Sequence, residues 1–162
     1  MTVHNVADPL TKTDTRIDTL EQVLDIITEE LIDWGAQRRV FKLAQQWKGE
    51  DVVMKVAPGA DFSQNIEEYD TWCHVQYTEY KKWFAKVHCM SQGGRVLIQS
   101  YVDPLPPSKA PDKMPVFLGD FKYGNYGIKG NQVVCKDYGT NLLRTTGLIK
   151  RTRKVEWRID TE

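Results

Sequence analysis

The stretch on which the fold prediction depends is residues 63–90, SQNIEEYDTWCHVQYTEYKKWFAKVHCM. It contains neither glycine nor proline, and its large side chains recur every three or four residues, the spacing of one helical face. They are Tyr69, Trp72, Gln76, Tyr80, Trp83 and Val87, with Cys73 and Phe84 widening the stripe. The pattern predicts one long helix. At helical spacing, such an aromatic row favours packing in a core over stacking on nucleic-acid bases.

A second apolar stripe precedes this segment and predicts a second long helix. It consists of Ile17, Leu20, Leu24, Ile27, Leu31 and Trp34, again three or four residues apart. Gly35 is placed to end the helix. The stripe is shorter than the repeats that identify a coiled coil, so two interpretations stay open. The helix packs in the core, or its apolar seam faces another subunit.

Alternating apolar and polar residues predict strands elsewhere. Residues 38–47 and 52–56 alternate on either side of a polar tetrapeptide with glycine, which indicates a β-hairpin, although a helix over 36–47 is an alternative. The apolar run 95–102 is typical of a buried strand. Five prolines make 103–115 an extended connector.

Three more strands are expected at 116–123, 132–137 and 147–159, separated by glycine clusters. The expected fold class is therefore α+β, with two long helices packed on a mainly antiparallel sheet. The polar residues 1–14 are expected to be a flexible N-terminal arm, and residues 15–162 a single domain.

Charge is distributed unevenly along the chain, although its formal net charge is zero. Residues 1–70 carry 14 acidic and 7 basic side chains, whereas residues 71–162 carry 8 acidic and 15 basic ones. Opposite net charges of −7 and +7 favour contact with a second copy or with a polyanion. The three cysteines are odd in number and include no CxxC pair, which indicates reduced thiols. We therefore expect a cytoplasmic protein, located in the host cell or the virion if the source is viral. No long apolar run predicts a membrane span.

No local motif names a reaction, a cofactor or a metal. Two Cys–His pairs, Cys73-His74 and His88-Cys89, are the nearest approach to a metal site, but one helix would hold them roughly 21 Å apart. The glycines from Gly124 to Gly130 lack the spacing of a phosphate-binding loop and predict a hairpin turn. No catalytic residue, metal ligand or cofactor is therefore predicted.

The last predicted strand places two arginines in succession on its apolar face. Either they lie beyond the core face as a solvated edge, or they bind an acid or phosphate. The second interpretation predicts an anion-binding or partner-binding surface together with the basic and aromatic residues of the glycine cluster. Its predicted members are Lys150, Arg151, Arg153, Lys154, Lys122, Tyr123, Tyr126 and Lys129.

Three function classes remain open on these grounds. The first is a non-enzymatic interaction or assembly protein, a homo-oligomer or part of a larger complex such as a virus or phage particle, which uses the basic C-terminal ribbon to contact an acidic partner. The second is a nucleic-acid-binding module, whose affinity would fall steeply with salt. The third is a small enzyme whose active site is assembled from distant residues.

Overall fold

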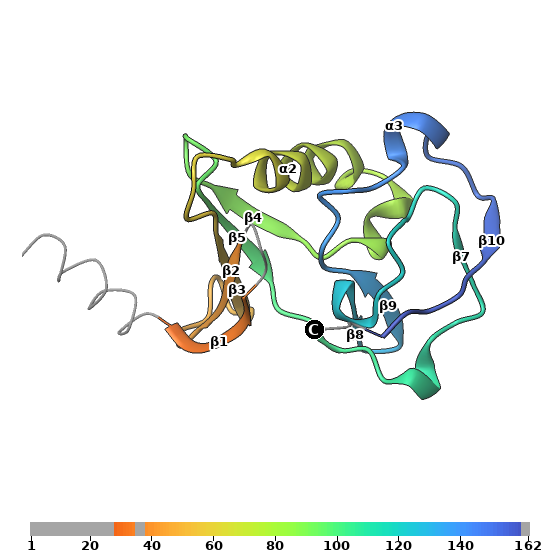
Figure 1. The fold of residues 1–162 in the computed structure, drawn as a ribbon, viewed down its shortest axis with the longest axis horizontal. Helices are drawn as coiled ribbons and strands as arrows, with labels where there is room; N and C mark the ends of the chain where they lie inside the picture. Colours follow the sequence, from red (N-terminus) through yellow and green to blue (C-terminus); the bar gives the residue numbers. More distant parts are fainter. Residues whose placement is uncertain (1–27, 35–37, 160–162) are drawn as a thin grey trace, which may run out of the picture.

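The computed structural model describes residues 28–34 and 38–159 (Figure 1). Its largest unit is a five-stranded antiparallel sheet in the order β1-β2-β3-β5-β4. The strands are β1 (Thr28–Trp34), β2 (Arg39–Leu43), β3 (Val52–Val56), β4 (Val87–Met90) and β5 (Val96–Ser100). Because β5 pairs with β3, the chain leaves the sheet after β3 and returns at its other edge through β4.

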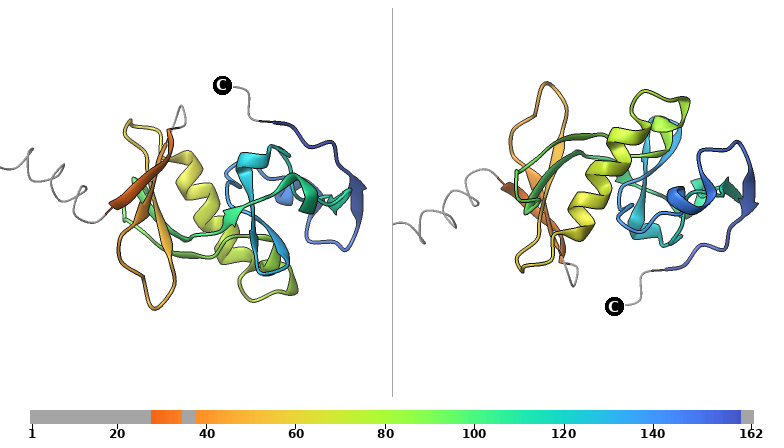
Figure 2. Two further views of the ribbon diagram at one scale, coloured as in Figure 1. Left: turned by 90° about the horizontal axis from the view of Figure 1, so that it is seen from below. Right: turned by 90° about the horizontal axis from the view of Figure 1, so that it is seen from above.

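Helix α2 (Ser63–Val75) makes this excursion and lies across one side of the sheet, against β4 and β5 (Figure 2). Strand β3 is buried on both of its faces, as its apolar sequence VVMKV requires. Val52 and Met54 pack with Ile98 on the side away from α2. The alternation of a strand then directs Val53 and Lys55 to the opposite side, where the helix lies.

The remaining elements are short and lie beyond the far end of α2 and β5 (Figure 1). A three-stranded sheet contains β6 (Asp103–Pro104), β8 (Tyr126–Lys129) and β9 (Gln132–Cys135), and a two-stranded one contains β7 (Lys113–Pro115) and β10 (Thr152–Lys154). The 3₁₀ turns are η2 (Glu79–Trp83), η3 (Pro107–Lys109) and η4 (Tyr123–Asn125), and α3 (Leu143–Thr146) is a single helical turn. One apolar core, which includes Phe84, Leu97, Phe117 and Tyr138, joins these segments to the sheet.

The expected fold class is wrong. The described residues form ten strands in antiparallel sheets and two α-helices, of which only α2 exceeds one turn. The predicted helix over 17–34 is contradicted at its end, because residues 28–34 form β1, and its earlier part lies outside the described residues. Leucine, isoleucine and tryptophan suit a strand as well as a helix, and antiparallel pairing with β2 decides between them.

The predicted helix over 63–90 is correct only as far as Val75. The hydroxyl of Thr78 donates to the carbonyl of Val75 at 2.8 Å and accepts from the backbone of Tyr80 at 3.2 Å. A threonine that bonds the backbone in this way competes with the helix and starts the 3₁₀ turn η2. The aromatic side chains still reach the core, as predicted, but from a helix, a turn and a strand in succession.

Several shorter predictions are confirmed. The hairpin of β2 and β3, the buried strand β5 and the strand β9 lie where the alternating patterns placed them. Residues 116–123 are not a strand, and the segment 147–159 contains only the three residues of β10. The glycine cluster 124–130 is not one turn, because β8 occupies most of it.

Gly127 shows why glycine is needed inside β8. A Cβ atom at this position would lie 2.5 Å from the carbonyl oxygen of Asp103, on the neighbouring strand β6. The turn that follows β8 is at Gly130, whose φ of +61° suits glycine.

The predicted arm, residues 1–14, lies outside the described residues. In the part of the chain that is described, no helix has the length and apolar character needed to cross a membrane.

Candidate functional site

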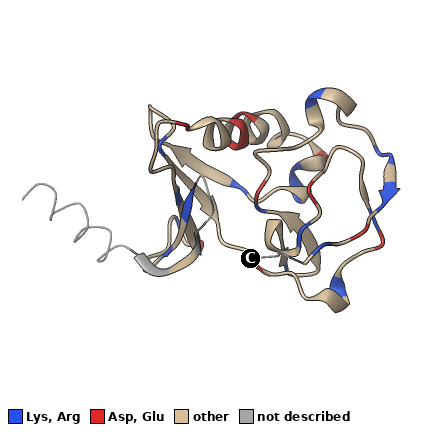
Figure 3. Ribbon diagram, in the orientation of Figure 1, with Lys and Arg blue, Asp and Glu red and all other residues tan. Residues whose placement is uncertain are grey.

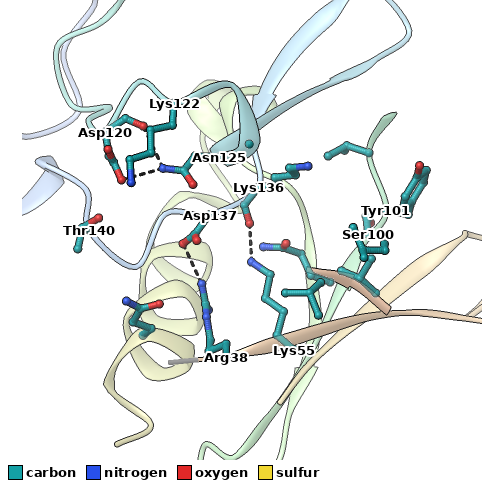
Figure 4. Close-up of a pocket in the computed structure, with 17 residues that line it drawn as sticks. Arg38, Lys55, Ser100, Tyr101, Asp120, Lys122, Asn125, Lys136, Asp137 and Thr140 are labelled. Carbon is teal, nitrogen blue, oxygen red and sulfur yellow. Dashed lines mark hydrogen bonds and ion pairs between the residues drawn. The ribbon is translucent and has the colours of Figure 1, made fainter. Parts of the chain in front are cut away.

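A cavity of about 340 Å³ lies between the five-stranded sheet and the segments around β8 and β9 (Figure 4). The sheet contributes the apolar side chains of Ile32, Val40 and Val53 to its wall. The opposite wall carries polar groups, which include Asp120, Lys122, Asn125, Asp137 and Thr140. The sheet also contributes the polar side chains of Lys55, Gln99 and Ser100, so the cavity combines apolar and charged groups, an arrangement that suits a ligand with an apolar part and a charged part.

A fully buried carboxylate, Glu68, lies behind the lining of this cavity, where it contacts the lining residues Lys55 and Arg38. It is positioned by α2, whose buried face also carries Asn65, Thr71 and Val75. Glu68 accepts hydrogen bonds from the ammonium of Lys55 and from the guanidinium of Arg38, both at 2.8 Å. The backbone N–H of Tyr138 and the amide of Gln99 lie at 3.3 and 3.4 Å. Water does not reach this carboxylate. Its negative charge is therefore balanced by two cations that are themselves buried.

Lys55 is placed by the register of β3. Its ammonium donates to Glu68 and to the backbone carbonyl of Lys136, the residue after β9 (Figure 4). Its side chain is only 5% exposed, and its two hydrogen bonds connect helix α2 to the end of β9. A lysine fixed in this way presents its charge to the cavity at one defined position.

Arg38 directly precedes β2 and is the second buried cation. It donates to the side-chain oxygen of Asn65 at 3.2 Å, to Glu68 and to Asp137 at 2.8 Å. Burial lowers the pKa of Arg38, but the two carboxylates outweigh burial and raise it. Burial likewise raises the pKa of Asp137, and Lys55 and Arg38 outweigh it, so that the pKa is lowered. Arg38 and Asp137 are therefore charged at neutral pH.

The polar wall is built by the turn between Asp120 and Asn125. The side-chain amide of Asn125 donates to the carboxylate of Asp120 at 2.8 Å and to its backbone carbonyl at 3.1 Å. Asp120 has a φ of +44°, which is uncommon for a residue other than glycine and is often found at functional sites. The other oxygen of its carboxylate accepts from Arg158.

Backbone hydrogen bonds join this turn to Asp137. The carbonyl of Asn125 accepts from the N–H of Lys136 at 2.9 Å and from the N–H of Asp137 at 3.2 Å. These bonds hold Asp120, Asn125 and Asp137 close together, and Lys55 reaches the same place through its bond to the carbonyl of Lys136.

The residues predicted to bind an anion do not form one surface. Lys122 lines the cavity. Tyr126 is fully buried, with its hydroxyl donating to the carbonyl of Gly119, so it is not accessible to a ligand. Tyr123 stacks on Trp157. Lys129 forms an ion pair with Glu50 on another side of the molecule.

The basic C-terminal segment is divided as well. Arg153 is exposed, but its guanidinium donates to the carbonyl of Leu118 at 2.8 Å and lies over the ring of Phe121. Lys150 pairs with Glu79, and Arg151 and Lys154 are exposed. Lysines and arginines also occur in the five-stranded sheet, and acidic residues lie among the basic ones of the C-terminal segments, so the described chain has no single positive half (Figure 3).

Five polar groups were not predicted: Lys55, Asp120, Asn125 and Asp137, which line the cavity, and Glu68, which lies behind Lys55. A lysine within the apolar strand VVMKV and a glutamate on the buried face of α2 were usable signals, because charges at core positions require partners. Of the predicted residues, only Lys122 belongs to this site.

No family model matches this chain, and no curated protein matches it. Within the described residues, no cluster of three or more His, Cys, Asp or Glu side chains could hold a metal ion. Asp137 and Asn125 do provide two oxygen donors at one place. Mg²⁺ commonly binds to one or two such protein groups when phosphate oxygens complete its coordination.

Proposed function

We propose that this chain binds a nucleoside triphosphate with a divalent cation and transfers the terminal phosphoryl group to an acceptor hydroxyl. The observation that carries this proposal is that Lys55, which is paired with the buried Glu68, lines one cavity together with Asp137, Asn125 and Asp120. Protein kinases use this set of groups for phosphoryl transfer.

The order of these groups along the chain supports the same proposal. Lys55 ends the tetrapeptide Val-Val-Met-Lys on the third strand, and Glu68 lies on the helix that follows. Asp120 precedes Asn125 by five residues, and Asp137 begins an Asp-Tyr-Gly sequence after β9. In protein kinases the corresponding lysine, glutamate, aspartate, asparagine and second aspartate occur in this order.

The chain also departs from that pattern. Leu118 and Gly119 stand where kinases have the histidine and arginine before the catalytic aspartate, and Tyr138 stands where they have phenylalanine. The sequence between Trp34 and Arg39 contains one glycine, Gly35, where the glycine-rich loop of kinases has three. Helical structure after the Asp-Tyr-Gly sequence is limited, within the described residues, to the single turn α3.

The shape of the cavity supports a nucleotide as the ligand. Its volume falls within the range of small-molecule sites, and Ile32, Val40 and Val53 offer a flat apolar surface to a base. The charged groups of the lining would meet the phosphates.

Each charged residue then has a role. Lys55, held by Glu68, would bind phosphate oxygens and orient them. Asp137 and Asn125 would hold the divalent cation, which neutralises the charge of the phosphates. Asp120 would accept the proton of the acceptor hydroxyl. The acceptor oxygen forms a bond to the terminal phosphorus, the bond from that phosphorus to the bridging oxygen breaks, and a nucleoside diphosphate leaves.

Calorimetric titration with Mg²⁺ and ATP tests binding, and transfer of labelled phosphate from γ-labelled ATP tests the reaction. We expect Lys55→Met to weaken nucleotide binding roughly tenfold or more, because a charge-assisted contact is lost. We expect Asp120→Asn to retain binding and lose phosphoryl transfer. Lys82→Met, at an exposed lysine outside the cavity, is the matched control. Absence of nucleotide binding by the unchanged protein would refute the proposal.

The interaction and nucleic-acid hypotheses remain predictions for the surface that carries Arg151 and Lys154. These side chains are exposed at the two-stranded sheet of β7 and β10. Arg151→Ala with Lys154→Ala should weaken association with an acidic partner and leave nucleotide binding unchanged, because neither residue lines the cavity.

A further inference from the structure

Arg38 occupies an unusual place in the proposed nucleotide site. It lies directly before β2, and its side chain extends into the cavity instead of toward solvent (Figure 4). The guanidinium bridges the carboxylates of Glu68 and Asp137, with Asn65 as a third partner. A side chain that is 6% exposed and makes three polar contacts is held in one position.

The two carboxylates that Arg38 contacts have different surroundings. Glu68 is fully buried and keeps Lys55 as a second partner. The side chain of Asp137 is 42% exposed and faces the cavity. Asp137 is therefore the carboxylate that a cation from solvent can reach.

Oxygen Oδ1 of Asp137 accepts a charge-assisted hydrogen bond from the guanidinium at 2.8 Å, so a metal ion at this oxygen must share it with the arginine. The positive charge of the guanidinium also repels a divalent cation at the same place.

Resting on the proposed function, we propose that Arg38 is a resident cation of the phosphate site that competes with the divalent cation for Asp137. Metal binding weakens the contact of the guanidinium with Asp137, because the two cations repel each other, while Glu68 and Asn65 keep the arginine inside the cavity. Arg38 then sets the metal concentration at which the site becomes loaded, and its charge remains available to the phosphates.

The test compares Mn²⁺ binding to the full chain, measured by electron paramagnetic resonance with and without ADP. We expect Arg38→Met to bind Mn²⁺ roughly tenfold more tightly than the unchanged protein, because one charge-assisted hydrogen bond no longer opposes the metal. Arg38→Lys, which keeps the charge but cannot bridge the same three partners, should lie between the two. Arg95→Met is the matched control, since Arg95 is exposed, stacks on Phe62 and lies outside the cavity.

Thermal unfolding with and without Mg²⁺ gives a second readout that includes the stability of each variant. A metal that binds only the folded state raises the melting temperature, and it should do so more for Arg38→Met than for the unchanged protein. Equal or weaker metal binding by Arg38→Met, with Mn²⁺ and ADP still binding to the unchanged protein, would overturn the role of Arg38 alone. If the unchanged protein and all three variants fail to bind Mn²⁺ and ADP, both this inference and the proposed function are overturned.

Discussion

Replacing Glu68 by glutamine tests the ion-pair network on which the site depends. The substitution keeps the size of the side chain but removes the charge that Lys55 and Arg38 share, each at 2.8 Å. Both cations are nearly buried, with 5% and 6% of their side chains exposed, so neither can recover full hydration. Removing one member of a buried ion pair costs about 3–5 kcal/mol. We therefore expect a loss of about 4 kcal/mol in the free energy of unfolding.

Urea denaturation followed by far-UV circular dichroism measures this loss as a lower midpoint at an unchanged slope. The neighbouring substitution Glu67→Gln is the control, because Glu67 pairs with Arg144, whose side chain is 72% exposed. Such a surface pair contributes about 1 kcal/mol or less. Similar losses for both variants, or a loss below about 1 kcal/mol for Glu68→Gln, would refute the network as a buried structural unit.

A double-mutant cycle separates the pair of Lys55 and Glu68 from the rest of the network. Lys55→Met leaves Glu68 with Arg38 as a partner, so we expect this variant to fold. The double variant should lose less stability than the two single losses combined, by about 0.5–3 kcal/mol, because contacting residues are energetically coupled. Strict additivity would mean that the 2.8 Å contact contributes no coupling energy.

Two further predictions concern acid sensitivity and packing. The hydrogen bond from Ser100, followed by the charges of Lys86 and Lys129, lowers the pKa of Glu50 from 4.5 to about 2. The ionised Glu50 therefore stabilises the fold above pH 4.5, and this stabilisation is lost as the pH falls toward 2. In melting experiments over this range, Glu50→Gln should be less stable than the unchanged protein at neutral pH and should approach it in acid; a constant difference would contradict this. Gly127→Ala should lower the free energy of unfolding in urea by about 3 kcal/mol, because the new methyl group meets the backbone of β6. The control Gly59→Ala, whose methyl group would have no atom within 4 Å, should change this free energy by less than about 0.5 kcal/mol. Equal midpoints for both glycine variants would contradict the close approach.

Local sequence patterns correctly predicted strands that are separated from their neighbours by a clear turn. The hairpin of β2 and β3 and the strand β5 are examples, because alternation and glycine-containing turns act over neighbouring residues. Spacings of three and four residues were less decisive. They placed the start of α2 correctly, but they could not show that Thr78 would end it or that residues 28–34 would pair as a strand.

The candidate site was not predicted, although its signals stand in the sequence. Lys55 on a buried strand and Glu68 on a buried helical face each needed a partner, and the Asp-Tyr-Gly sequence at Asp137 follows a predicted strand. The predicted site consisted instead mainly of basic residues. At the surface, water satisfies the charge of such residues without any partner, so their sequence pattern does not indicate a site.

By itself, the sequence determined which segments alternate, where glycine permits a turn and which charges stand among apolar neighbours. Only the tertiary structure decided which charges meet. Arg38 and Asp137 are 99 residues apart, and Lys55 and Glu68 are joined only because α2 packs on the face of β3 that carries the lysine. The physical reason is that an ion pair depends on distance in space, whereas a sequence pattern reports only the direction in which each side chain leaves its own helix or strand.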